Sequence, residues 1–316
     1  MRPGGDTEGI YVTTEHLVAL EGPARDLAFV QKAPSHQQLA GRMQSSLRGR
    51  GLIFEELREY LPGDDIRSID WRVTARTGKP VIRVYGEEKE RPALLLVDQR
   101  INMFFGSRRA MKSVTAAESA MLCAWRILGS GDRVGGFVFG DDDIDEVKPH
   151  RSRNAVISFA DRISRKNVAL HANYSGAASA GSLNDTLSRT ASLAHHDHLI
   201  ILVSDLNGHD NITRDMLLRL SQSNDVMCLI VYDPFLLHLP KTGSIVVSGG
   251  YLQAELPLGQ RSVRDAIDSF ARERGRELQS WQRELGLPML PVSAAEETAP
   301  QLRSLLEQSA WRQRRR

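Results

Sequence analysis

After Pro92 the chain alternates apolar runs with helical segments, and this alternation constrains the fold more than any other feature. Strands are predicted over residues 93–97 (ALLLV), 133–139 (RVGGFVF), 198–203 (HLIILV) and 226–232 (VMCLIVY). Helices are predicted over residues 109–128, 152–165, 183–195 and 213–222. The inner strands are continuously apolar, as burial on both faces requires, so the pattern predicts an α/β fold with a mostly parallel sheet and crossover helices.

Both ends of the chain add further elements. Helical stretches within residues 15–44 predict an arm against the main body, and residues 79–90 an exposed or edge strand. A hairpin over 243–257, a helix over 261–285, a strand over 288–292 and a helix over 297–308 complete the chain. We therefore predict an N-terminal extension (residues 1–91), an α/β domain (92–310) and a basic tail (311–316).

Bulk properties exclude several classes of protein. The 41 basic and 39 acidic side chains leave a net charge of +2, which gives no overall attraction to nucleic acid or anionic lipid. Cys123 and Cys228 each lie in an apolar segment, which predicts two buried thiols and favours the cytoplasm. Because the amino terminus lacks a secretory pattern and no run approaches ~20 apolar residues, we expect a soluble protein without direct membrane insertion.

The run from Arg50 to Arg91 alternates acidic and basic side chains around single aromatic residues. Pro62 and Gly63 predict a turn, after which Asp64 and Asp65 are placed to cap a short helix. Trp71 is expected to insert into a neighbouring element. We expect planar bidentate ion pairs between two sets of residues: Arg58, Arg67, Arg72 and Arg76, and Asp64, Asp65 and Asp70. Two interpretations remain open, an internal ion-pair network that fixes docking and a charged surface that faces a partner.

A long motif in this run carries a family resemblance. Its members are Gly49, Gly51, Phe54, Leu57, Arg58, Tyr60, Pro62, Gly63, Asp64, Asp65, Arg67, Ile69, Asp70, Trp71, Ala75 and Arg76. The motif closely resembles the bacterial domain-of-unknown-function family 58 (DUF58), and the resemblance continues through residues 94–106, 199–206 and 231–243. It implies a von Willebrand factor A-like domain with an N-terminal extension, usually encoded beside an AAA+ ATPase of the MoxR group.

Asp98 and Asp205 follow two of the predicted parallel strands, where ligands bind in open α/β sheets. In von Willebrand factor A domains the first such loop reads D-x-S-x-S and holds magnesium through two hydroxyls, with a threonine from another loop. Here Arg100 and Asn102 replace the serines, and residues 171–182 contain no threonine. A guanidinium has only donors, so we expect Arg100 to lie between Asp98 and Asp205 as a built-in cation. The alternative is a weak magnesium site made of Asp98, Asn102, Asp205 and a serine.

Other candidate sites are weaker. Ser204, Asp205 and His209 lie close in sequence but lack the turn that exposes a nucleophilic serine. A zinc site is one interpretation of His195, His196 and His198, but a solvated helix end is favoured. A calcium site is one interpretation of residues Asp141 to Asp145, but a solvated turn between two strands is favoured. Phosphate binding is one interpretation of the tail from Trp311 to Arg316, but a solvated tail is favoured. No glycine pattern supports nucleotide binding.

Two accounts follow from these features. The first is a non-enzymatic, cytoplasmic adaptor whose partner is a MoxR-type AAA+ ATPase, with membrane-bound von Willebrand factor A proteins as further partners, in complex assembly or chaperone-like maturation. This account expects no cofactor and no nucleic acid. The second account is a metal sensor or metal-dependent enzyme that uses Asp98 and Asp205.

Overall fold

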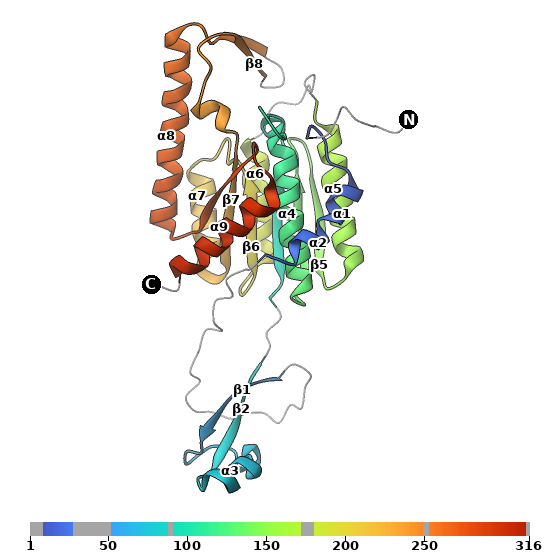
Figure 1. The fold of residues 1–316 in the computed structure, drawn as a ribbon, viewed down its shortest axis with the longest axis vertical. Coiled ribbons are helices and arrows are strands. Elements are labelled where there is room, and N and C mark those ends of the chain that lie inside the picture. The colour runs from blue at the N-terminus through green and yellow to red at the C-terminus, as the bar shows by residue number, and fades with distance from the viewer. Residues whose placement is uncertain (1–8, 28–51, 88–90, 172–179, 249–252, 314–316) are drawn as a thin grey trace. The chain divides into compact units, whose positions relative to one another are not determined.

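The computed structural model describes residues 9–27, 52–87, 91–171, 180–248 and 253–313 (Figure 1). The chain divides into two compact units: Met1–Gln31 with Arg91–Arg316, and Lys32–Glu90. The predicted boundary after residue 91 is therefore close, but the predicted assignment of the first residues to the extension is wrong. Residues 9–27 belong to the larger unit, because Val12, Leu17, Ala24 and Leu27 lie in its core.

A six-stranded sheet forms the centre of the larger unit. Its order is β10 (Met289–Ser293), β7 (Asp225–Tyr232), β6 (Leu199–Ser204), β3 (Ala93–Asp98), β4 (Val134–Phe139) and β5 (Ile144–His150). Neighbouring strands are parallel except for β5, which runs antiparallel to β4 at one edge. Counted along the chain from β3, this is the doubly wound order 3-2-1-4-5-6, so the switch point lies between β3 and β6. The predicted α/β class with a mostly parallel sheet is confirmed.

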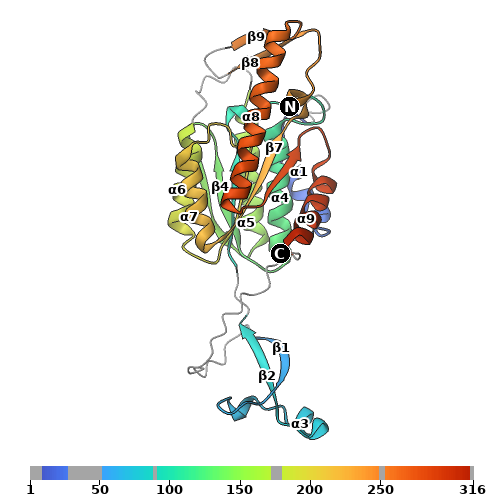
Figure 2. The ribbon, with the colours of Figure 1, turned by 90° about the vertical axis from the view of Figure 1, so that its left-hand side faces the viewer.

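Helices cover both faces of the sheet (Figure 2). One face carries α1 (Thr14–Ala19), α2 (Glu21–Ala24), α4 (Lys112–Gly129), α5 (Arg153–Ala169) and α9 (Thr298–Gln313). The other face carries α6 (Ala180–Leu193), α7 (Asn211–Ser223) and the carboxyl end of α8 (Arg261–Leu285). The part of the predicted arm that the structure describes forms α1 and α2, which contact α4 and α5, and residues 28–44 of that prediction lie outside the described residues.

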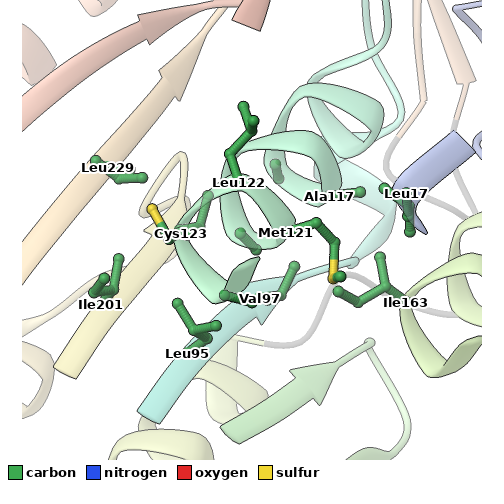
Figure 3. Packing of buried hydrophobic residues seen from close by; sticks show 14 of the residues in the cluster. Leu17, Leu95, Val97, Ala117, Met121, Leu122, Cys123, Ile163, Ile201 and Leu229 are labelled. Carbon is green, nitrogen blue, oxygen red and sulfur yellow. The ribbon is translucent and has the colours of Figure 1, made fainter. Parts of the chain in front are cut away.

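The strand β3 shows why its sequence is continuously apolar. Leu95 and Val97 point into the core beneath α4 and α5, whereas Leu94 and Leu96 belong to the core beneath α6 and α7. All six residues of β3 are buried, since helices cover the sheet on both sides. Figure 3 shows Leu95 and Val97 in the first core with Met121 of α4.

The antiparallel strand β5 closes one edge of the sheet. Asp141, Asp142 and Asp143 lie in the turn between β4 and β5, as predicted, but Asp141 is buried rather than solvated, and Asp145 lies within β5. In β4, Gly136 has φ +148°, and a Cβ atom there would lie 1.9 Å from the carbonyl oxygen of Leu95. Only glycine permits this close pairing of β3 with β4.

The remaining elements of the larger unit follow β7. A 3₁₀ turn η3 (Pro234–Leu237) leads to the antiparallel hairpin of β8 (Ser244–Ser248) and β9 (Gln253–Pro257), which confirms the predicted hairpin. The helix α8 contacts η3 and α7, and only Trp281 and Leu285 of its side chains are buried. Among the described residues no helix is both long and apolar enough to cross a bilayer.

The smaller unit is a two-stranded antiparallel sheet with two short helical elements. The strands are β1 (Leu52–Glu59) and β2 (Val81–Glu87), and the helical elements are η1 (Ile66–Ser68) and α3 (Trp71–Thr77). Both η1 and α3 contact β2. The strand β2 confirms the predicted edge strand. Gly49 and Gly51 of the motif lie outside the described residues.

Candidate functional site

The most constrained polar cluster of the larger unit lies at the switch point of the sheet. Asp98 is the last residue of β3, and Asp205 directly follows β6. Because β3 and β6 are adjacent and parallel, their carboxyl ends bring the two aspartates to the same edge. The sequence therefore predicted the place of this pair correctly.

Asp98 is held by its own loop and by β6. The side chain of Arg100 donates from Nε to Asp98 Oδ1 at 3.0 Å and from its terminal nitrogen to Oδ2 at 2.6 Å. The Oγ atom of Ser204 donates to Oδ2 at 2.6 Å, and the backbone N–H of Arg100 donates to Oδ1. Since Asp98 and Arg100 are 0% and 2% exposed, this is a fully buried bidentate ion pair.

Asp205 is bound by a different cation. Lys112, the first residue of α4, donates from Nζ to Asp205 Oδ2 at 2.6 Å. Oδ1 accepts from Asn102 Nδ2 at 2.9 Å and from the backbone N–H of Asn207 at 2.7 Å. The side chains of Lys112 and Asp205 are 13% and 12% exposed, so this pair is also shielded from water.

Arg100 was expected to bridge the two aspartates, and the structure corrects this expectation in part. Arg100 makes its bidentate pair with Asp98, while Lys112 supplies the cation hydrogen-bonded to Asp205. The negative charge of Asp205 still helps to raise the pKa of Arg100. The cluster thus holds two internal cations rather than one.

Electrostatics in the cluster favour the charged forms of Arg100 and Asp205. Burial works to lower the pKa of Arg100, but the charge and hydrogen bonds of Asp98, with the charges of Asp205 and Asp141, raise that pKa above its ordinary value. Burial works to raise the pKa of Asp205, but Lys112 and Arg274 hold it below its ordinary value. The carboxylate of Asp205 therefore stays charged while Lys112 and Arg274 are in place.

Neighbouring elements fix the orientation of this cluster. The guanidinium of Arg100 lies 5.5 Å from the ring centroid of Phe139, the last residue of β4. The backbone N–H of Ile101 donates to Asp141 Oδ2 at 2.8 Å, which ties the loop to the β4–β5 turn. Arg274 of α8 donates to the carbonyl oxygen of Asp205 at 2.7 Å. Residues from β4, from the β4–β5 turn and from α8 thus hold the two loops.

The residues at this pair do not fit magnesium, the ion that the resemblance implies. Magnesium requires a near-octahedral set of oxygen ligands at about 2.0–2.1 Å. Here all four carboxylate oxygens of Asp98 and Asp205 accept hydrogen bonds from the chain itself, and two of the donors are cations. Asn102, a ligand in the alternative site, directs its amide nitrogen to Asp205. An ion would have to displace both cations.

The other candidate sites of the larger unit have structural partners. Ser204 is fully buried, donates to Asp98, and accepts the N–H of Leu206 at 2.8 Å. His209 is hydrogen-bonded through Nδ1 to the carbonyl of Leu206 and pairs through Nε2 with Glu277. The structure thus gives Ser204 and His209 separate partners.

The candidate histidines, the cysteines and the basic tail lie outside the two strand-end loops in the sequence. His195 and His196 are exposed beyond the end of α6, and no group of three potential metal ligands occurs within the described ranges. Cys123 and Cys228 are buried free thiols, and burial raises the pKa of each to about 12. The backbone of α9 continues to Gln313, whereas residues 314–316 of the basic tail lie outside the described residues.

The second candidate site is the charged motif of the smaller unit. Asp64 accepts the N–H of Leu61 at 2.8 Å and pairs with Arg58 at 3.0 Å, across a turn in which Gly63 has φ +110°. Asp65 caps η1 through the N–H of Arg67 at 2.9 Å. The short helix predicted after these aspartates is the 3₁₀ element η1, which ends at Ser68, and the helix α3 begins separately at Trp71.

Asp70 is the central carboxylate of this motif. Its Oδ1 accepts the N–H groups of Arg72 and Val73 and so caps α3, while Oδ2 accepts from Arg83 Nε at 2.7 Å. The hydrogen bond from Arg83 is the main cause that lowers the pKa of Asp70. The sequence did not single out Arg83, although β2 pairs with β1 and places it beside the motif.

Three of the four arginines expected in ion pairs do not form them. Arg67, Arg72 and Arg76 are exposed, and among residues 57–83 no ion pair joins them to a carboxylate. The expected insertion of Trp71 is also wrong, since 66% of this residue is exposed. Tyr60 is half-buried, and its N–H donates to the carbonyl of Pro80 at 2.9 Å. The motif is thus partly an internal scaffold and partly an exposed surface.

The fold and the strand-end pair define a class of protein: a doubly wound α/β domain whose switch-point aspartates are bound by the chain's own cations. The family model described as "Protein of unknown function DUF58" matches residues 56–277, and the chain belongs to this family. That match spans both units and covers the motif of the smaller unit from Glu56 onward.

Relatives and solved structures complete the comparison. Uncharacterized proteins Mb1516 of Mycobacterium bovis and Rv1480 of Mycobacterium tuberculosis are each 26% identical over 228 residues, covering 72% of this chain and 70% of the relative. The conserved hypothetical protein BatB from Bacteroides thetaiotaomicron has a TM-score of 0.41 and 13% identity, covering 71% of this chain and 99% of that chain. An aerotolerance-related membrane protein from Bacteroides fragilis has a TM-score of 0.38 and 14% identity, covering 70% and 99%. Both structural similarities are too low to assign a function.

Proposed function

We propose that this chain is a non-enzymatic adaptor that binds other proteins through a von Willebrand factor A-like domain and the charged motif of its smaller unit. Its main partner is a MoxR-type AAA+ ATPase, and membrane-bound von Willebrand factor A proteins are further partners. The adaptor acts in the cytoplasm, in complex assembly or chaperone-like maturation.

The observation that carries this proposal is that cations of the chain itself bind the strand-end pair, Asp98 and Asp205. Arg100 and Lys112 engage Asp98 and Asp205, so these carboxylates are committed to holding loops rather than to binding an ion or activating a substrate. The carboxyl edge of the sheet is then a rigid surface, as recognition of a preformed partner requires. The exposed half of the motif in the smaller unit offers a second surface.

The von Willebrand factor A-like assignment is supported by the sheet and by the position of the aspartates. The doubly wound order, the single antiparallel edge strand and the helices on both faces agree with the fold that the motif's resemblance implies. The first aspartate opens the D-x-R-x-N loop at the end of β3. The ATPase partner follows from the family resemblance alone, so it requires a direct test.

Affinity purification of the tagged, full-length protein from its native host tests this function. The purification is run without nucleotide, with ATP and with a slowly hydrolysed ATP analogue, and stoichiometric partners are identified by mass spectrometry. We expect a MoxR-type ATPase whose recovery depends on nucleotide, because an AAA+ ring changes its binding surfaces with nucleotide state. Recovery of no ATPase in any nucleotide state contradicts the proposal.

A further inference from the structure

The outward face of α3 is exposed to solvent. Trp71, Arg72, Ala75 and Arg76 are all exposed, and their spacing of one and four residues places them on one side of the helix. The opposite side faces β2, where Thr74 accepts the N–H of Val81 through its hydroxyl at 3.0 Å. We call the set Trp71, Arg72, Ala75 and Arg76 the α3 face.

Charge is not balanced among residues 57–83 of this unit. Three ion pairs account for six of the ten charged side chains in that range: Arg58 with Asp64, Lys79 with Glu59, and Arg83 with Asp70. Among residues 57–83 these pairs leave three exposed arginines, Arg67, Arg72 and Arg76, against one further carboxylate, Asp65. Because Asp65 already caps η1, the two positive charges of the α3 face have no counter-charge among residues 57–83.

An apolar anchor lies on the same face as these charges. Trp71 is 66% exposed, the highest value among the large hydrophobic side chains of the described residues, and Ile66 of the preceding η1 is 62% exposed. Tryptophan and arginine are the residue types that dominate the energetics of protein interfaces. An exposed pair of this kind on a short capped helix is therefore suited to binding rather than to folding.

We propose that the α3 face binds an acidic segment of the partner protein, in which carboxylates pair with Arg72 and Arg76 while an apolar side chain packs on Trp71. The two arginines lie four residues apart on one helix, about 5–6 Å between their Cβ atoms, which matches two carboxylates one turn apart on a partner helix. This inference rests on the proposed adaptor function and names the chemistry of its partner. Asp64, Asp70 and Arg83 then serve to hold α3 in place.

Charge complementarity favours a protein occupant over nucleic acid or a lipid surface. Proteins that bind duplex DNA electrostatically make several phosphate contacts along a basic stripe, commonly 6–10. The α3 face offers two arginines, and the whole chain has a net charge of only +2. Short acidic segments need no more than this, since each guanidinium can bind one carboxylate bidentately.

An Arg72→Glu variant of the full chain tests the charge. Arg72 is the second residue of α3, where a glutamate is favourable for the helix dipole, so a loss of binding cannot be attributed to a weakened helix. We expect the dissociation constant for the MoxR-type ATPase of the same host to rise at least about tenfold, since interface arginines reach this value or more. Trp71→Ala should weaken binding to a similar extent, with an unchanged thermal transition because the side chain is exposed.

The chain provides a matched control. Arg261→Glu makes the same change in the first turn of α8, where the side chain is 87% exposed and its ion pair with Asp265 is solvent-screened. This control should bind as the wild type does. Equal weakening by Arg72→Glu and Arg261→Glu would indicate a general charge effect and would overturn the proposal.

Site-specific crosslinking identifies what lies on the face. Trp71 is replaced by p-benzoylphenylalanine in the host, and the crosslinked peptide is sequenced by mass spectrometry. We expect a protein segment with at least two Asp or Glu residues beside an apolar one, and loss of the crosslink with Arg72→Glu. A crosslink to nucleic acid, to lipid or to a protein segment without acidic residues overturns the proposal, as does the absence of any crosslink.

The two proposals fail in different ways. If the ATPase binds wild type and Arg72→Glu equally, the α3 face is not its docking surface, while the adaptor function stands. If no ATPase binds in any nucleotide state but the crosslink from position 71 reaches another acidic protein segment, the α3 face stands and the ATPase partnership fails. Vesicles of phosphatidylglycerol and a 20-nucleotide DNA serve as competing probes, and neither should bind more tightly to wild type than to Arg72→Glu.

Discussion

Lys112→Met removes the cation that binds Asp205 while keeping most of the aliphatic length of the side chain. In the wild type, Nζ lies 2.6 Å from Asp205 Oδ2, and both side chains are nearly buried. Removal of one partner from a buried ion pair costs about 3–5 kcal/mol, because the remaining charge loses its counter-charge. Asp205 Oδ1 keeps its donors from Asn102 and Asn207, so we expect the lower end, about 3 kcal/mol.

The pH dependence of this variant follows from the lowered pKa of Asp205. The wild-type carboxylate contributes stability in full above its unfolded pKa of about 3.9, and this contribution is lost as the pH falls through the lower folded pKa. In Lys112→Met the effect of burial is no longer opposed by Lys112, so the pKa of Asp205 rises. The destabilisation relative to wild type should therefore be largest at pH 7 and should shrink as the pH falls below about 4.

Urea unfolding of four proteins measures this energy: wild type, Lys112→Met, Asp205→Asn and the double variant. An asparagine at position 205 still accepts the donors of Asn102 and Asn207 through its carbonyl oxygen, so the double variant is a neutral replacement for the pair. We expect it to be more stable than Lys112→Met, with a coupling energy of at least about 1.5 kcal/mol. The reasoning is refuted if Lys112→Met lies within about 0.5 kcal/mol of wild type at pH 7, the range of ordinary surface substitutions.

Three further predictions test other parts of the structure. Gly136→Ala should lower the free energy of unfolding of the larger unit, measured in urea, by more than about 3 kcal/mol, because Gly136 has a positive φ and an added Cβ atom would collide with β3. Gly129→Ala should be nearly neutral, because an added Cβ atom at position 129 meets open space. Burial works to raise the pKa of Glu118, but hydrogen bonds from His16, Arg109 and Thr298 hold that pKa at about 2, so the ionised carboxylate should stabilise the fold by about 3 kcal/mol above pH 4.5. Glu118→Gln should remove most of the stability loss that the wild type shows between pH 4.5 and 2. The same fall in the free energy of unfolding over this pH range in both proteins would contradict the prediction. Asp70→Ala should lower the thermal midpoint of the smaller unit more than Asp65→Ala, because Asp70 caps a longer helix and also binds Arg83; equal midpoints by circular dichroism would argue against it.

The sheet of the larger unit was predictable because its parallel strands are buried on both faces. Residues 93–97 of β3 are all apolar, Asp98 is the last residue of that strand, and Asp205 directly follows β6. The polar edge strand β5 carried a weaker signal, because one of its faces meets solvent and its sequence alternates charge with single apolar residues. The strand ends in the sequence therefore predicted where the candidate site lies, but not the distances between its side chains.

The partner of Asp205 was not predicted, and a physical signal for it existed. Lys112 is the first residue of α4, where the helix dipole disfavours a cation unless an anion lies close by. Arg274 offered no such signal, because its helix is remote in sequence and carries many charged side chains. In the smaller unit, opposite charges close in sequence suggested ion pairs for Arg72 and Arg76, but α3 turns both toward solvent. Sequence proximity alone does not determine which side of a short helix packs.

Calorimetric titration with magnesium and manganese tests most directly the claim that the chain's own cations occupy the strand-end pair. For the wild type we predict no saturable heat, because Arg100 and Lys112 engage both carboxylates. Arg100→Ser alone should gain little affinity, since Lys112 remains on Asp205, whereas Arg100→Ser combined with Lys112→Ser should bind the ion in a chelator-reversible manner. A stoichiometric, chelator-reversible isotherm in the low micromolar range for the wild type would contradict the account.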